Sequence, residues 1–445
     1  MRNLLIVALV SCAAVARAQD QDAGTTPPTP PEPSAAEIEQ ALRNDEAAKK
    51  KEQPPAAAPA PLPNAQPAGG GGWGAISRFV QSLNPDLSAI VDFAAGWYSN
   101  DTGTVKSGDD PGNTGFNVQE VEVALQAVVD PYFRADVFLT IPNLHGLEVE
   151  EAFLTTTNLP GNFQIKAGIF RAALGRQNAQ HLHLQDFTRR PGINAQFLGV
   201  DGLRAPGLEV NWLVPRIPFY LLLSLSAFSV GAADTDSPLA TFGGGERWDF
   251  AYVATAKTFF DLSEATSLYL GLNYAHGKTS QSVSHNETLP SGNVVDGHPG
   301  PTPYDNWYSN LYGVDLYLKW KPPNVSKTWA SVAWQTEYFI RDIPDLKLGL
   351  KAHRQTEGGL YSQLVIQAHR RWFLGLRGEL LGVPQADNVK RELAAAASLT
   401  WALSEFARVR LYGEARFPLT PNVRNNGAAF LQIEAAIGAH GAHPF

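Results

Sequence analysis

The sequence predicts an all-β protein: a transmembrane antiparallel β-barrel of about sixteen strands with a disordered N-terminal tail. Three observations support this prediction. Polar and apolar residues alternate along most of the chain from about residue 86, short turns alternate with longer connections, and aromatic residues gather at the ends of the alternating stretches. Together they are typical of a barrel whose outer face meets lipid and whose inner face meets water.

Residues 1–18 are interpreted as a secretory signal peptide. Arg2 provides a positive start, residues 4–10 are apolar, and residues 16–18 (ARA) form a small-x-small cleavage site. A lipoprotein box ending at Cys12 is the alternative, although the apolar run before it is very short. Cleavage after residue 18 removes the single cysteine of the chain, which excludes disulfides, thiol catalysis and cysteine metal sites.

Residues 19–82 are predicted to be a Pro/Ala/Gly-rich periplasmic linker, because this composition buries too little apolar surface to fold. A short exposed helix is expected within it at residues 34–51. Ser34 and Glu37 form a capping box there, and acidic and basic residues are spaced i, i+4. The outer-membrane barrel is predicted to follow, over residues 83–445.

The stretch FARVRLYGEARF (residues 406–417) illustrates the alternation, with charged residues and Tyr412 on one face and apolar residues on the other. Seven short turns alternate with eight outer connections, one of them predicted at residues 342–357, which gives an even number of about sixteen strands. A barrel of this size leaves an aqueous channel. After the signal peptide, no apolar run is long enough for a transmembrane helix.

Composition and motifs exclude several classes of function. The chain has 445 residues and a net charge of -8 without a basic stripe, which argues against nucleic acid as a partner. The sequence contains no GxSxG, HExxH or P-loop motif, so no enzyme and no cofactor are predicted. The expected partners are membrane lipid, lipopolysaccharide and small hydrophilic solutes or anions.

Four stretches carry a family resemblance: LNPDLSAIVDF (83–93), GFNVQEVEVALQAVVDPYFRADVFLTI (115–141), VEEAFLTTTNLPGNFQIKAGIFRAALGR (149–176) and GLRAPGLEVNWLVP (202–215). They resemble porin-like bacterial outer-membrane proteins related to the phosphate-selective porins O and P. Some members of this family are described as zinc-regulated, TonB-dependent outer-membrane receptors. The resemblance implies an outer-membrane porin for passive diffusion of small hydrophilic solutes, assembled as a homotrimer.

The third outer connection, residues 171–202, is the longest, and the resemblance to general diffusion porins implies that it folds inward and narrows the pore. It is expected to present positive charge to anions such as phosphate through Arg171, Arg176, Arg189 and Arg190. The lumen wall is expected to include Arg134, Lys166, Arg377, Arg408, Arg410, Arg416, Glu120 and Glu122. The alternative is that these arginines pair with carboxylates and brace the wall, with weak selectivity.

The same connection contains a possible metal site made of His181, His183 and Asp186. An H-x-H pair in an extended segment places both rings on one side, and a carboxylate is a common third ligand of zinc. The alternative is that the histidines hydrogen-bond the loop backbone. Two further functions therefore stay open: a metal (zinc)-linked outer-membrane uptake or binding protein without a TonB plug, and a closed structural barrel of the envelope.

Overall fold

The computed structural model describes residues 86–99, 110–144, 146–199, 201–230, 241–242, 249–278, 287–288, 294–295, 308–323, 329–348, 351–384, 391–419 and 424–438. The predicted signal peptide (1–18), linker (19–82) and helix (34–51) lie outside the described residues. A two-stranded sheet of β10 (Glu287–Thr288) and β11 (Val294–Val295) is separate from the main sheet.

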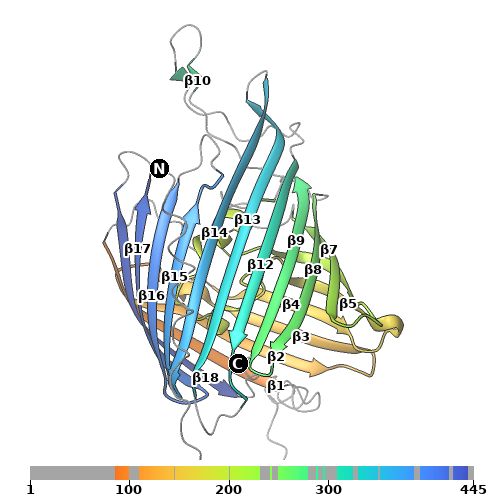
Figure 1. The fold of residues 1–445 in the computed structure, drawn as a ribbon, viewed down its shortest axis with the longest axis horizontal. Helices are drawn as coiled ribbons and strands as arrows, with labels where there is room; N and C mark the ends of the chain where they lie inside the picture. Colours follow the sequence, from red (N-terminus) through yellow and green to blue (C-terminus); the bar gives the residue numbers. More distant parts are fainter. Residues whose placement is uncertain are drawn as a thin grey trace, which may run out of the picture. The chain divides into compact units, whose positions relative to one another are not determined.

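The described residues form a closed antiparallel barrel of sixteen strands, which confirms the predicted fold class (Figure 1). Neighbouring strands pair in chain order, and β1 pairs with β18 to close the ring. The strands are β1 (Asp86–Tyr98), β2 (Gly115–Val128), β3 (Phe133–Thr140), β4 (Glu148–Thr156), β5 (Phe163–Arg171), β6 (Arg204–Leu213), β7 (Tyr220–Ser229), β8 (Phe250–Ser263), β9 (Thr266–Lys278), β12 (Tyr308–Trp320), β13 (Ser331–Leu348), β14 (Lys351–His369), β15 (Trp372–Leu381), β16 (Glu392–Ala402), β17 (Ala407–Pro418) and β18 (Asn426–Gly438).

The outer connection predicted at residues 342–357 lies between β13 and β14, but the predicted range was too wide. Strands β13 and β14 continue through most of it, with 18 and 19 residues, and project beyond their neighbours (Figure 1). Their pairing continues to Leu348 opposite Lys351 after a register shift between Ile343 and Leu346. Such an irregularity interrupts the alternation of period two by which a strand is recognised in a sequence.

The two faces of the barrel wall have opposite polarity. On β17, Arg410 and Arg416 point inward and are buried, whereas Leu411 and Phe417 are 53% and 42% exposed on the outside. Aromatic side chains on the outside stack across strands: Trp372 on Trp401, and Phe163 on Trp212. This polarity suits a wall with lipid outside and polar groups inside. No helix among the described residues is long and apolar enough to cross a membrane.

The inward segment, residues 172–203, connects β5 to β6 and lies inside the barrel. It contains a 3-10 turn, η3 (Leu182–Leu184), and a short helix, α3 (Gly192–Leu198). Most of its described residues are buried, and α3 contacts β13, β14 and β15. The 3-10 turns η1 (Pro142–Leu144) and η2 (Pro160–Asn162) lie in other connections.

Candidate functional site

The inward segment first contacts the wall at a tight turn on Gly175. The backbone N–H groups of Arg176 and Gln177 donate to Glu337 Oε1 at 3.1 and 2.8 Å, and Lys257 Nζ donates to the Gly175 carbonyl at 2.7 Å. Gly175 has φ +66°, and a Cβ there would lie 2.2 Å from Glu337 Oε2. Glycine is therefore required here both by the backbone conformation and by the approach to β13.

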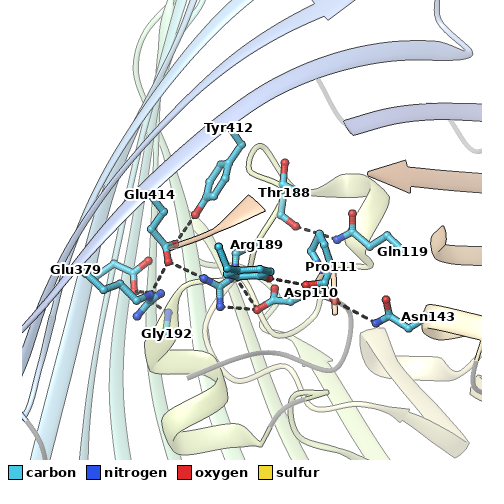
Figure 2. Close-up of polar contacts among 12 residues, drawn as sticks. Asp110, Pro111, Gln119, Asn143, Thr188, Arg189, Gly192, Glu379, Tyr412 and Glu414 are labelled. Carbon is cyan, nitrogen blue, oxygen red and sulfur yellow. Dashed lines mark hydrogen bonds and ion pairs between the residues drawn. The ribbon is translucent and has the colours of Figure 1, made fainter. Parts of the chain in front are cut away.

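A second contact is the Arg189 cluster, which consists of Arg189, Arg377, Arg416, Asp110, Glu379, Glu392 and Glu414. Figure 2 shows Arg189 between Asp110 and Glu414. Arg189 joins Asp110 and Glu414 at 2.7 and 2.6 Å. Arg416 also contacts Glu414, at 2.5 Å. The backbone N–H of Gly192 donates to Glu379 at 2.8 Å, so the cluster holds the start of α3 against β15.

The Arg189 cluster has three guanidinium groups and four carboxylates, all buried. Burial by itself lowers the pKa of Arg189, but Asp110 and Glu414 outweigh this effect and raise that pKa above its ordinary value. Arg189 therefore stays charged, and its charge is directed at carboxylates of the protein. This arrangement agrees with the bracing alternative for this arginine.

A third contact is the His181 cluster, which consists of His181, His183, Glu122, Glu150, Glu151 and Arg171. The Nδ1 atom of His181 lies 3.2 Å from Oε2 of Glu122 and 3.2 Å from Oε2 of Glu150. The Nε2 atom of the same ring lies 2.7 Å from Glu151 Oε2. His183 Nδ1 lies 3.2 Å from Glu122 Oε2, so the inward segment meets β2 and β4 through two imidazoles.

A β-bulge on β4 explains how two consecutive glutamates reach one cluster. Phe138 pairs with Glu151 and Leu139 pairs with Val149, which leaves Glu150 as the extra residue. Both Glu150 and Glu151 are buried, at 4% and 7% exposure, although residues that follow each other in a regular strand point to opposite faces. Bulges are known to redirect side chains near functional sites.

The electrostatics of the His181 cluster favour positive charge on the imidazole. Burial by itself lowers the pKa of His181, but Glu150, Glu122 and Glu151 outweigh it and hold that pKa well above its ordinary value. The cluster contains three carboxylates and one guanidinium, so its net charge is -2 when both imidazoles are neutral.

The basic vestibule is a cavity of about 660 Å³ at the short-turn end of the barrel, bounded on one side by Leu184 and Asp186 of the inward segment. Its described charged lining residues are Lys319, Lys321, Arg370, Arg371, Arg408, Arg410, Asp186, Glu405 and Glu434. Arg408 Nε donates to Glu434 at 2.8 Å. Asp186 is exposed to this cavity, and partial loss of water around its carboxyl inside the barrel raises its pKa, partly offset by Arg410 and Arg408.

The four arginines predicted to face the pore occupy different surroundings. Arg171 belongs to the His181 cluster and Arg189 to the Arg189 cluster. The guanidinium of Arg176 lies 4.0 Å above the ring of Tyr317, and Arg190 is buried at 4% exposure.

The residues predicted for the lumen wall also divide. Arg377 and Arg416 belong to the Arg189 cluster, Glu122 to the His181 cluster, and Arg408 and Arg410 to the basic vestibule. The others lie elsewhere on the wall: Lys166 is 3.6 Å from Glu209, Arg134 pairs with Asp136 at 2.8 Å with its side chain 47% exposed, and Glu120 is buried on β2.

Of the predicted metal ligands, the structure brings together His181 and His183, whose ring centroids are 5.7 Å apart. Asp186 lines the basic vestibule instead. Among the described residues, the group whose ligand atoms converge within 4.8 Å is Glu122, Glu150 and His181. The sequence reasoning missed Glu150 and Glu151. The adjacent pair of glutamates was visible, but the bulge that turns both inward was not.

Comparisons of the sequence with known proteins identify one relative. No family model matches the chain. An uncharacterized protein of Aquifex aeolicus (strain VF5) is 32% identical over 408 residues, covering 83% of this chain and 82% of that protein.

Solved structures resemble the barrel at low identity. They include Pseudomonas putida OprB at high pH, with TM-score 0.52, 11% identity and coverage of 82% of this chain and 97% of OprB. The outer membrane channel DcaP of Acinetobacter baumannii gives TM-score 0.50 and 12% identity, with 79% and 97% coverage. The trimer form of Vibrio cholerae OmpT gives TM-score 0.50 and 8% identity, with 79% and 99% coverage. The chain thus has the fold of the porin-like β-barrels and belongs to the same family as the Aquifex aeolicus protein.

Proposed function

We propose that the protein is an outer-membrane channel for passive diffusion of small hydrophilic solutes, with a preference for anions such as phosphate. The observation that carries this proposal is the basic vestibule inside a closed sixteen-strand barrel, directly below the inward segment. Barrels of this strand number enclose an aqueous lumen. The fold shared with DcaP, which is described as an outer membrane channel, supports the same function and location.

The preference for anions rests on the charges of the basic vestibule. Its described lining has six basic side chains against three acidic ones, and one of these three, Glu434, is paired with Arg408. No described carboxylate lies within 4.0 Å of the Lys319 or Lys321 ammonium. An excess of fixed positive charge in a narrow passage raises the local anion concentration and sets ionic selectivity.

Two of the arginines predicted for the third outer connection have a different part in this proposal. Arg171 and Arg189 fix the position of the segment through carboxylates of β4, β17 and the first connection, so they shape the passage rather than attract solutes. Transport then needs hydration and electrostatic filtering, without bond chemistry, so we propose no enzymatic role. Lipid and lipopolysaccharide are the expected surroundings, and the trimer form of OmpT favours a homotrimer.

Planar-bilayer conductance of the purified protein in a salt gradient tests the proposal. We expect stepwise openings with a reversal potential on the anion side, reduced towards zero in the Lys319→Gln/Lys321→Gln variant. A matched control is Arg216→Gln/Arg391→Gln, which removes the same charge from exposed positions outside the vestibule. An unchanged reversal potential in the lysine variant, with openings preserved, would contradict the proposed source of selectivity.

A closed structural barrel is the second candidate, because the inward segment is fastened on several sides of the lumen. It contacts β13 through Glu337, β4 through Glu150 and β17 through Glu414. A complete absence of conductance above background, with a correctly folded barrel, would favour this candidate over a channel.

A further inference from the structure

We propose that the His181 cluster is a binding site for a divalent transition-metal ion, which fastens the inward segment to strands β2 and β4. The ligands are Glu122, Glu150 and His181 through Nδ1, with His183, whose Nδ1 lies 3.2 Å from Glu122 Oε2, as the fourth donor. This inference is independent of whether the barrel conducts.

The spacing of the three donor atoms fits a metal ion. Oxygen atoms of Glu122 and Glu150 each lie 3.2 Å from His181 Nδ1, and all three donors lie within 4.8 Å of one another. Tetrahedral zinc with bonds of about 2.0–2.1 Å places its ligand atoms about 3.3–3.4 Å apart. Only small side-chain movements are therefore needed to admit the ion.

The groups behind the ligands are arranged as they are in metal centres. A histidine that binds zinc through one nitrogen usually donates its other ring N–H to a carboxylate. Here His181 Nε2 lies 2.7 Å from Glu151 Oε2, and the second oxygen of Glu151 accepts the Arg171 backbone N–H at 2.6 Å. These contacts fix the ring with Nδ1 directed at Glu122 and Glu150.

The two carboxylate oxygens of Glu150 also have different roles, one held by the protein and one directed at the proposed metal position. Its Oε1 accepts a hydrogen bond from Arg171 Nε at 3.1 Å. Its Oε2 is buried and accepts no hydrogen bond of good geometry from the described residues, while it faces His181 Nδ1 at 3.2 Å. When His181 Nδ1 carries no proton, this buried carboxylate oxygen has no donor, which is costly unless a cation satisfies it.

Charge and donor type define the class of ion. With neutral imidazoles the cluster has a net charge of -2, which a divalent cation balances. Mixed imidazole and carboxylate donors suit zinc and its first-row neighbours, whereas magnesium and calcium prefer ligand sets made of oxygen. A proton on His181 Nδ1 occupies the same position as the metal, so proton and metal compete for it.

The test uses the full mature chain, folded in detergent without a polyhistidine tag, stripped with EDTA and titrated with Zn²⁺ by calorimetry. We expect about one zinc per chain, retained through gel filtration, as for a closed site with protein ligands. Glu122→Gln and His181→Asn should abolish retention, and Glu151→Gln should weaken binding about 10–100-fold. His276→Asn, which changes a histidine of β9 that contacts Asn310, should bind zinc like the wild type.

A measurement on the wild type alone guards against variants that fail to fold. X-ray absorption of the zinc-loaded protein should show nitrogen and oxygen ligands at about 2.0–2.1 Å with imidazole scattering. Absence of retained zinc in the wild type, zinc without imidazole, or unchanged retention in Glu122→Gln and His181→Asn would each overturn the site. The cluster would then be held by an imidazolium on His181 alone.

Discussion

The inward segment is anchored by two buried charge clusters, and they differ in how their charges are balanced. The Arg189 cluster sets three guanidinium groups against four carboxylates, so most of its compensation comes from the protein. The His181 cluster sets three carboxylates against one guanidinium and two imidazoles that are neutral unless protonated. The charges of the Arg189 cluster are therefore nearly balanced by the protein itself, whereas those of the His181 cluster are balanced only by an added proton or cation.

The largest expected effect concerns the cluster that needs no added ion. Glu414→Ala leaves Arg189 and Arg416 without a shared carboxylate in a buried site. Removing one partner of buried ion pairs usually costs about 3–5 kcal/mol of unfolding free energy. Urea unfolding in micelles, followed by tryptophan fluorescence, should show this loss. It should be the same with and without zinc.

The matched control for this variant is Glu264→Ala, an exposed glutamate on the turn between β8 and β9. Exposed substitutions of this kind usually stay within about 0.5 kcal/mol. If Glu414→Ala unfolded like Glu264→Ala, the Arg189 cluster would not anchor the segment.

Metal removal should affect only the other cluster. At free zinc about 100 times the dissociation constant, binding to the folded state adds about 2.7 kcal/mol of unfolding free energy. Addition of EDTA should therefore lower the urea midpoint of the wild type but not that of Glu122→Gln. An equal shift in both proteins would assign the effect to zinc bound elsewhere.

The turn at Gly175 shows whether the two clusters suffice to hold the segment. Gly175→Ala places a Cβ against Glu337 at a residue with φ +66°. Strain of this kind costs about 1–3 kcal/mol, and we expect this loss in the same unfolding assay. Gly413→Ala is the control, because a Cβ on β17 at that position meets nothing within 4 Å. Equal stability of the two variants would mean that the Gly175 turn adapts freely.

The smallest expected effect concerns Asp186 and the pH. Because partial loss of water inside the barrel raises its pKa, this carboxyl takes up a proton at a higher pH than an aspartate in bulk water does. The vestibule then becomes more positive, so anion preference should rise as the pH falls through that value. The other vestibule carboxylates, Glu405 and Glu434, face the same cavity.

Asp186→Asn separates Asp186 from those neighbours. The variant should have the higher anion preference already at neutral pH. A unit charge acting on an anion across about 10 Å of water contributes about 0.4 kcal/mol, so we expect a difference of about twofold. The readout is the reversal potential across a pH series. If the reversal potentials of the wild type and the variant differ by the same amount at every pH, Asp186 does not titrate in this range.

Most of the barrel could be predicted because its strands obey a simple rule. Alternation of polar and apolar residues identified β17, and the turn positions gave the even strand number. The rule failed where the backbone departs from a regular strand. The irregular pairing near Ile343 hid the ends of β13 and β14, and the bulge at Glu150 hid the inward direction of Glu151.

The candidate sites were harder to predict because they depend on contacts between distant parts of the chain. The sequence places Asp186 three residues after His183, yet the two face different surroundings. Glu122 and Glu150 come from other strands and reach His181 only because the segment crosses the lumen. Local spacing holds no information about which wall a residue of an inward segment will meet.

The closure of the ring has a consequence for the order of assembly. Pairs between consecutive strands form locally, whereas the β1–β18 seam joins Ser88 to Gly438 at opposite ends of the barrel sequence. Bringing distant parts of a chain together costs entropy before their contacts form, so this step is slow. We therefore expect the β1–β18 seam to form last. The inward segment contacts both β2 and β17, on the two sides of that seam. Its docking can therefore bring the two ends of the sheet close to each other before β1 pairs with β18.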